Sequence, residues 1–167
     1  MTKGKMLEFE QYVRIKGSDR IQINNILSAV CVGVLSILLA LSGSQLSAWT
    51  IGQLAFAIPC LVTSSLAYAK ICYRPSDEYR AWDRLGWVTH SVGYIMILNA
   101  MGIMLYRSDY PAISWGFIAL TIILFVAYST LDVIARKSRL KEKGLKLGFY
   151  LLSLFLGSVL PLLTGLV

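Results

Sequence analysis

The sequence predicts an all-α integral membrane protein with five transmembrane helices in one bundle, its N-terminus cytoplasmic and its C-terminus outside. Of the 167 residues, 56% are hydrophobic and 15% are charged, against about 45–50% and about 25% in typical soluble domains. The apolar residues form five runs, each close to the roughly 20 residues that cross a hydrocarbon core. Basic residues cluster in alternate connections between these runs, as they do in multi-pass proteins.

A polar N-terminal arm precedes the bundle. The arm covers residues 1–20 and the bundle residues 21–167, with predicted spans at 23–41, 49–71, 85–106, 113–135 and 145–167. Apolar and polar side chains alternate between Leu7 and Lys16, which favours an extended, strand-like arm, with an interfacial helix as the alternative. The run Gly17-Ser18-Asp19 is expected to end the arm and to cap the first span.

The first two spans contain small residues and a proline. Small side chains share one face of the first span, which predicts a close helix contact: Ala29, Gly33, Ser36 and Ala40. Pro59 lies inside the second span, and it is expected to bend the helix because it removes one backbone hydrogen bond. Thr63, Ser64 and Ser65 follow one turn later, where their hydroxyls can bond to the freed carbonyl groups.

The third span is the central one and carries most of the polar intramembrane chemistry. It contains the single histidine of the chain, His90, and a mid-span amide, Asn99. Gly86, Gly93 and Ala100 recur every seven residues with His90 on the same side, which predicts a close helix–helix or oligomer contact. Asn99 lies about 180° around the helix from His90, because nine residues at about 100° each separate them. Two faces of this helix are therefore expected to pack.

The last two spans add a charged pair and a glycine motif. Asp132 lies four residues before Arg136, a spacing at which the two side chains can pair on one helix face. The fifth span begins with Gly144 and Gly148, a GxxxG motif typical of packed membrane helices and a second candidate for helix or oligomer contact. Pro161 is expected to bend the last third of this span.

The orientation follows from the distribution of positive charge. Of the 16 Lys and Arg residues, five precede the first span. Four lie at or after the end of the second span and before the third, including Lys70 in its last turn, and six lie between the fourth span and the first turn of the fifth, including Lys146. Arg107 alone lies on the other side. The positive-inside rule then places the N-terminus in the cytoplasm and the C-terminus outside. We expect a plasma or inner membrane.

His90 has a functional and a structural interpretation. It could bind a metal or haem, or relay protons, but a metal site needs several converging ligands and a relay usually needs an intramembrane acid. The sequence provides neither, so we expect His90 to bond to a backbone carbonyl or a hydroxyl. Cys31, Cys60 and Cys72 show no paired spacing, which argues against a disulfide framework or a zinc site. No catalytic residue, metal or cofactor is expected.

Asn99 also has two interpretations. It could line a pore, in a polar network with Thr121 and Asp132, or it could make an interhelical hydrogen bond, which we favour. The charges ahead of the third span favour a solvated face, because Asp77, Arg80 and Asp83 are spaced three residues apart and can pair on a helix surface.

The basic cytoplasmic residues are candidates to bind anionic inner-leaflet lipid or an acidic protein partner. Each basic residue near such lipid contributes about 1 kcal/mol. The candidates are Arg80, Arg84, Arg136, Lys137, Arg139, Lys141 and Lys143. No nucleic acid is expected, because the basic run lacks the interleaved aromatic residues that stack on bases.

Two functions remain as the main hypotheses. The favoured one is a non-enzymatic membrane subunit that forms homo-oligomers through its small-residue faces and presents a basic cytoplasmic surface to anchor, recruit or signal to a partner. The alternative is a small oligomeric channel or transporter whose pore is lined by Asn99 and helix hydroxyls. A membrane-embedded enzyme that uses His90 is a weaker third hypothesis.

Overall fold

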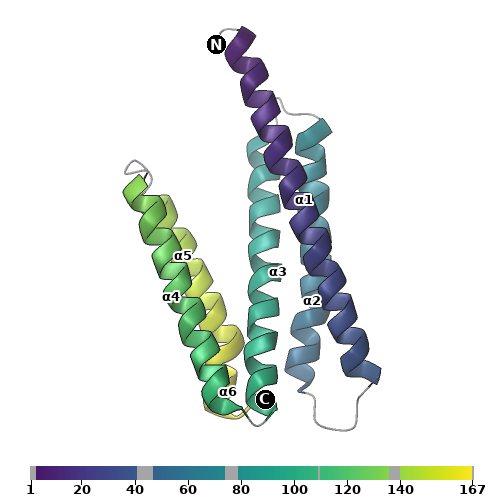
Figure 1. The fold of residues 1–167 in the computed structure, drawn as a ribbon, viewed down its shortest axis with the longest axis vertical. Helices are drawn as coiled ribbons and strands as arrows, with labels where there is room; N and C mark the ends of the chain where they lie inside the picture. The colour runs from purple at the N-terminus through teal and green to yellow at the C-terminus, as the bar shows by residue number, and fades with distance from the viewer. Residues whose placement is uncertain (1–2, 41–46, 74–78, 109, 136–139, 167) are drawn as a thin grey trace. The chain divides into compact units, whose positions relative to one another are not determined.

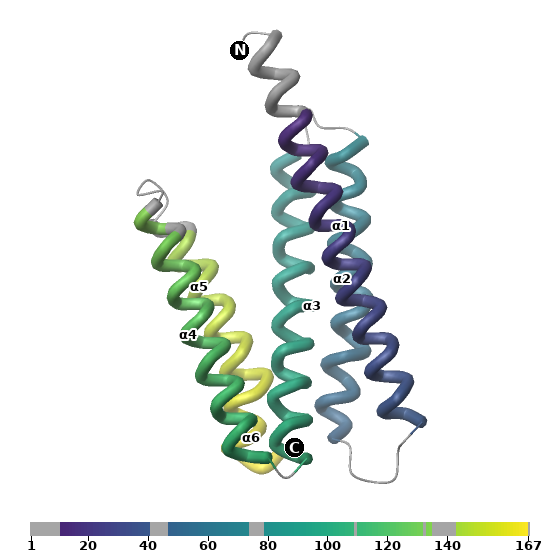
Figure 2. Tube along the Cα trace, in the orientation of Figure 1, coloured from purple at the N-terminus to yellow at the C-terminus, as the bar shows by residue number. Residues whose placement is uncertain are grey.

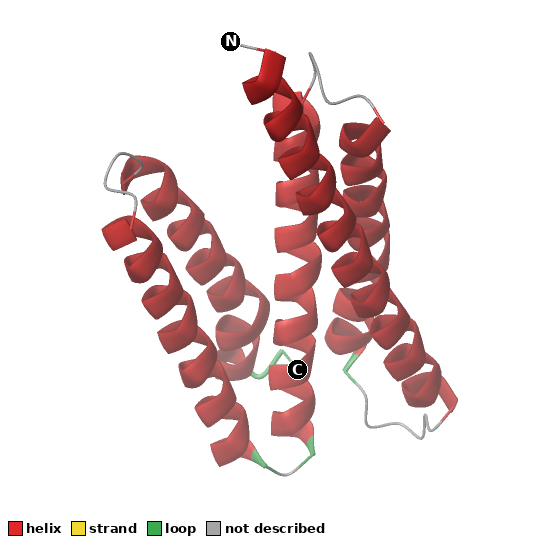
Figure 3. Cartoon of the chain, turned by 45° about the horizontal axis from the view of Figure 1, so that its top comes forward, coloured by secondary structure: helices red, strands yellow, loops and turns green. Residues whose placement is uncertain are grey.

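The computed structural model describes residues 3–40, 47–73, 79–108, 110–135 and 140–166, and nearly all of these residues are helical. No strand occurs among them (Figure 3). Five helices are long and apolar enough to cross a membrane. The predicted all-α class and its five candidate spans are therefore confirmed, and the multi-pass membrane class is supported.

The five helices follow one another along the chain with short connections (Figure 1). Helix α1 covers Lys3–Ala40, α2 covers Ala48–Tyr73 and α3 covers Tyr79–Arg107. Helix α4 covers Pro111–Ala135. The fifth span is built from three pieces in succession: α5 (Leu140–Leu154), the π-helix η2 (Phe155–Val159) and α6 (Leu160–Thr164). In the sequence, Pro75 followed by Ser76, Asp77 and Glu78 predicts a helix start near Ser76, a position that lies outside the described residues.

The prediction of an extended arm is wrong, because α1 begins at Lys3 and continues through Gly17 without a break. Val13 is buried and packs with Tyr68 and Ile71 of α2. A Cβ added at Gly17 would lie 2.5 Å from the sulfur of Cys72, so this glycine permits close packing and does not end the helix. The buried positions Val13 and Gly17 are four residues apart, which is a helical spacing. The alternation of apolar and polar residues in the sequence did not reveal it.

The described residues form two compact units. Unit 1 comprises residues 1–40 and 54–94, and unit 2 comprises residues 41–53 and 95–167. In unit 1, α1 lies against α2 and α3, and in unit 2, α4 lies beside α5 (Figure 2). The core of unit 2 contains Ile103, Ile118, Leu154 and Leu162. The assignment of residues 21–167 to one bundle stays a prediction.

Two glycines of the α3 stripe make close contacts inside unit 1. A Cβ at Gly86 would lie 2.9 Å from the ring of Tyr68, and one at Gly93 would lie 2.9 Å from Leu61 and 3.1 Å from the carbonyl oxygen of Ala57. Such spacing leaves no room for a side chain, so the glycines let α3 approach α2. Ala100, the third member of the stripe, is fully buried.

The glycines of the GxxxG motif in α5 have different surroundings. A Cβ added at Gly144 or Gly148 would meet no described atom within 4 Å. The same holds for Gly33 on α1 and Gly116 on α4. The described chain therefore fills the glycine positions of α3 but leaves those of α5 open.

Candidate functional site

A chain of buried and half-buried polar groups links the three helices of unit 1. Helix α1 supplies Arg20 and Asn24, α2 supplies Ser64, and α3 supplies His90 and the carbonyl group of Gly86. Arg20 Nη1 lies 3.3 Å from His90 Nε2, and His90 Nδ1 lies 2.6 Å from Asn24 Oδ1. Asn24 Nδ2 donates to Ser64 Oγ at 2.9 Å, and Ser64 Oγ donates to the carbonyl oxygen of Gly86 at 2.7 Å.

Donor and acceptor chemistry assigns a direction to this chain. A guanidinium can only donate, so the Nε2 atom of His90 must accept from Arg20. In a neutral imidazole the other nitrogen then carries the proton, and His90 Nδ1 donates to the carbonyl oxygen of Asn24. Asn24 next donates to Ser64. Every group in the chain therefore has a partner of the correct kind, with neutral His90 in one defined tautomer.

Asn24 is the centre of this chain. Its carbonyl oxygen accepts from α3 and its amide nitrogen donates to α2, although it belongs to α1, so one side chain connects three helices. Asn24 and Ser64 are fully buried, where each unpaired polar group would cost about 1–3 kcal/mol. The chain of bonds therefore fixes the relative rotation of the three helices.

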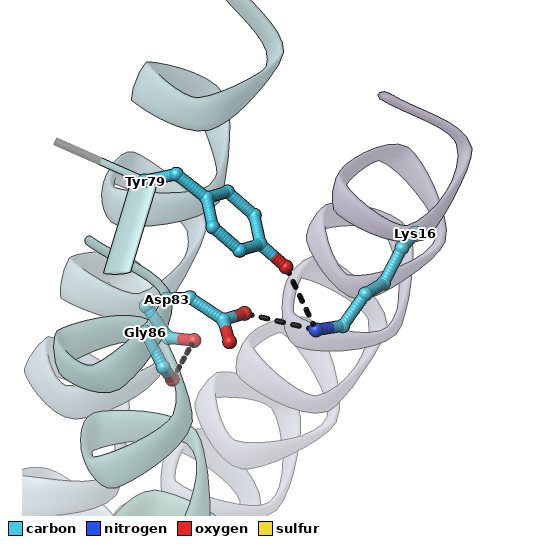
Figure 4. A network of polar contacts seen from close by, with 5 residues as sticks. Lys16, Tyr79, Asp83 and Gly86 are labelled. Carbon is cyan, nitrogen blue, oxygen red and sulfur yellow. Dashed lines mark hydrogen bonds and ion pairs between the residues drawn. The ribbon is translucent and has the colours of Figure 1, made fainter. Parts of the chain in front are cut away.

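An ion pair extends this arrangement toward the N-terminal end of α1. Lys16 Nζ lies 2.9 Å from Asp83 Oδ1 and 3.5 Å from the hydroxyl oxygen of Tyr79. Figure 4 shows Lys16 reaching from α1 to these two residues of α3. Asp83 thus pairs with a residue far away in the sequence, whereas spacing alone had suggested Arg80. Lys16 lies one turn before Arg20, so the two contacts share one face of α1.

A second polar cluster lies in unit 2, where the fifth span becomes irregular. Pro161 has no N–H, so the carbonyl group of Gly157, four residues earlier, loses its usual helical donor. Two side chains at the start of α2 replace it: Trp49 Nε1 donates at 2.9 Å and Gln53 Nε2 at 2.8 Å. The π-helix η2 directly precedes this proline, and the bend expected at Pro161 stays a prediction.

Three buried polar atoms of this cluster have no hydrogen-bond partner among the described residues. They are Oε1 of Gln53, Oδ1 of Asn99 and Oγ of Ser158. Their residues are 8%, 3% and 1% exposed. Asn99 Nδ2 donates to the carbonyl oxygen of Ser153 on α5 at 3.3 Å, which is the interhelical bond expected for this residue. π-Helical turns occur often at functional sites.

The three atoms belong to one neighbourhood. Gln53 bonds to the carbonyl group of Gly157, and the amide of Asn99 occupies the space where Gly157 would carry a Cβ. Ser158 Oγ lies 3.2 Å from the equivalent position on Gly102, one turn after Asn99. Because all three atoms are oxygens, the cluster is suited to bind hydrogen-bond donors or a cation.

The remaining predicted site residues fall into three groups. Thr121 is buried, and its hydroxyl donates to the carbonyl oxygen of Phe117 in its own helix at 2.8 Å. Arg80 and Arg84 are exposed, and Lys143 is half-buried. The others lie outside the described residues or have side chains that do: Asp132, Arg136, Lys137, Arg139 and Lys141. The expected pair of Asp132 with Arg136 therefore stays a prediction.

Several site residues differ from the sequence prediction. Ser64 and Ser65 were expected to bond within α2, but they donate to Gly86 of α3 and to Asn25 of α1. His90 bonds to the side-chain amide of Asn24 and the guanidinium of Arg20, not to the expected backbone carbonyl or hydroxyl. The sequence prediction also missed Gln53 and Ser158. The available signal was Gly157 four residues before Pro161, a spacing that predicts a carbonyl group in need of a donor.

Comparisons of the chain with protein-family models, with curated proteins and with solved structures found no match. Among the described residues, no group of three or more His, Cys, Asp or Glu side chains could hold a metal ion. The polar chain of unit 1 and the polar cluster of unit 2 are therefore the two candidate sites.

Proposed function

We propose that the protein is a non-enzymatic multi-pass membrane subunit that associates with a second copy and presents a basic cytoplasmic surface to a partner protein. The observation that carries this proposal is the contrast between two sets of glycines. Gly86 and Gly93 of α3 contact α2 within the chain, whereas a Cβ at Gly144 or Gly148 of α5 would meet no described atom. A GxxxG face that the chain leaves open is suited to a helix of another copy.

The cytoplasmic surface is the second part of the proposal. The positive-inside rule supports a cytoplasmic N-terminus, and the exposed basic residues of unit 1 then lie on that side: Arg14, Lys70, Arg80 and Arg84. The polar chain from Arg20 to Gly86 and the Lys16–Asp83 pair hold α1, α2 and α3 together. This arrangement supports a rigid basic surface, on which a partner can recognise geometry as well as charge.

Association is tested by filling the open face. Gly148→Leu, alone and with Gly144→Leu, is expected to reduce the oligomer mass in mild detergent, because leucine keeps the helix backbones apart. Gly116→Leu on α4 is the matched control, since a Cβ there also meets no described atom and the sequence predicts no contact for this glycine. Light scattering with subtraction of bound detergent gives the mass. A monomeric wild type, or a double variant with wild-type mass, would contradict the association.

The partner surface needs a separate experiment. Arg80→Lys with Arg84→Lys keeps the charge but removes the planar, bidentate donors of arginine. A docked protein should be recovered less well with this variant, whereas attraction to lipid depends mainly on charge. Arg80→Gln with Arg84→Gln removes the charge as well. Equal recovery of every cytoplasmic protein with wild type and both variants would reject the partner surface.

The cluster in unit 2 supports a second candidate function, a small channel or transporter. Asn99, Gln53 and Ser158 provide three buried oxygens without partners in the described part of the chain, and such oxygens favour a cation or a small polar solute. Asn99→Leu should then abolish flux through reconstituted protein. Thr130→Val is the control, because the Thr130 hydroxyl is bonded to its own helix and the residue is not part of the predicted pore network. Flux that survives Asn99→Leu, or the absence of any flux in wild type, would remove this candidate.

A further inference from the structure

A groove runs along unit 1 between the last turns of α2 and the first turns of α3. Its volume is about 700 Å³. Leu66, Lys70 and Tyr73 line it from α2, and Trp82 and Leu85 line it from α3. Leu66 is 64% exposed and Tyr73 is 84% exposed. The groove therefore presents large apolar side chains to whatever surrounds unit 1.

The side chains that line the groove change from apolar to polar along its length. Leu66 lies one helical turn before Lys70, which is about 6 Å at 1.5 Å per residue, and Tyr73 ends the helix. Apolar side chains thus occupy one end, and a cation with two aromatic rings, Tyr73 and Trp82, occupies the other. Tyr and Trp prefer the level of the lipid headgroups. A phospholipid has the same order of groups, from acyl chain to interface to phosphate.

The polar end of the groove carries two cations that form no ion pair with a described residue. Lys70 lies in the last turn of α2, and Arg14 lines a neighbouring groove of about 540 Å³ that shares Tyr73. Neither cation forms an ion pair with a described residue. The nearby acid Asp83 is already paired with Lys16 at 2.9 Å. An anion is therefore the ligand that this end favours.

We propose that this groove binds an anionic phospholipid, with an acyl chain along Leu66 and Leu85 and the phosphate at Lys70. Tyr73 and Trp82 then lie at the level of the glycerol backbone. Lys70 is one of the basic residues from which the orientation of the helices was predicted, and in this proposal it also binds the phosphate of a lipid. This inference requires that the five helices lie in a membrane, but it does not depend on association through α5.

The first experiment measures retained lipid. The full chain is purified from bilayers that contain equal amounts of phosphatidylglycerol and phosphatidylcholine, and bound lipid is counted by native mass spectrometry. Wild type should retain phosphatidylglycerol in preference. Lys70→Gln should weaken this preference about fivefold, the effect of one cation at an anionic headgroup. Arg107→Gln, which removes an exposed charge in the last turn of α3, should leave it unchanged.

A second variant tests the acyl part of the site without a change of charge. Thr63 is exposed and lines the groove, so Thr63→Trp should fill the space and reduce retention of phosphatidylglycerol. Thr130→Trp, at an exposed threonine of α4, is the matched control. Inorganic phosphate is added in a separate arm and should not displace the lipid.

Each result has a defined meaning. Equal retention of the two lipids, wild-type preference in Lys70→Gln, or wild-type retention in Thr63→Trp would overturn the proposal. Displacement by inorganic phosphate would mean that the site recognises a free anion and not a lipid. A change of oligomer mass in Lys70→Gln or Thr63→Trp at constant lipid content would assign the groove to a second copy of the chain, which also overturns it.

Discussion

The two units use buried polar side chains in opposite ways. In unit 1, the chain from Arg20 through His90, Asn24 and Ser64 ends on a backbone carbonyl group, and each member has a partner. In unit 2, Asn99 and its neighbours include three buried oxygens that have none among the described residues. A complete network stabilises one arrangement of helices, whereas an incomplete one favours a ligand or a second arrangement. The polar groups of unit 1 therefore hold its helices in one arrangement. In unit 2, three acceptor oxygens stay open among the described residues.

The largest expected effect comes from breaking the network of unit 1 at its centre. Asn24→Leu removes partners from both His90 and Ser64, so we expect a loss of about 2–5 kcal/mol in the free energy of unfolding. Asn25→Leu is the control, because Asn25 is exposed and accepts one bond from Ser65. Unfolding in mixed micelles with increasing dodecyl sulfate measures both. Equal stabilities for the two variants would show that the buried network does not hold the helices together.

The second prediction compares a glycine that contacts a neighbouring helix with a glycine that contacts no described atom. Gly93→Leu should overpack the contact of α3 with Leu61 and Ala57, at a cost of about 1–3 kcal/mol. Gly148→Leu should cost nothing in the same unfolding measurement and should act only on oligomer mass. If Gly93→Leu leaves both stability and yield unchanged, the close approach of α3 to α2 is wrong.

Replacing Asn99 of unit 2 by leucine should change the free energy of unfolding less than replacing Asn24 of unit 1 by leucine. Asn99→Leu removes one hydrogen bond at 3.3 Å, but it also removes an oxygen that has no partner. Replacement of an unsatisfied polar group by an apolar one of similar size is nearly neutral, so we expect a change within about 1 kcal/mol. A loss as large as that of Asn24→Leu would mean that the two amides have the same structural role.

The smallest effect concerns the ion pair of unit 1. The side chains of Lys16 and Asp83 are 34% and 31% exposed, and such pairs contribute about 0–1 kcal/mol. Lys16→Gln should therefore lower stability by less than about 1 kcal/mol. The difference from wild type should shrink further in high salt, which screens the pair. A salt-independent loss would indicate that packing of the lysine stem, and not its charge, stabilises the contact.

The sequence by itself determined the all-helical class and the locations of five apolar helical segments. Runs of about 20 apolar residues are a local property, so the five spans could be located without knowledge of their neighbours. Pro161 likewise marked the irregular part of the fifth span. The arm was predicted incorrectly because a short alternating pattern at Leu7–Lys16 fits both a strand and a helix, and packing of Val13 against α2 decides for the helix.

Only the tertiary structure decided which polar groups meet. Asn24 is 40 residues from Ser64 and 66 from His90, and helix rotation and register bring them together. Those quantities depend on close packing at Gly17, Gly86 and Gly93, which no single helix reveals. The donors to the Gly157 carbonyl group come from α2, more than 100 residues earlier. The packing of the helices thus decides which polar groups bond to each other. The sequence of each helix shows only which polar groups need a hydrogen-bond partner.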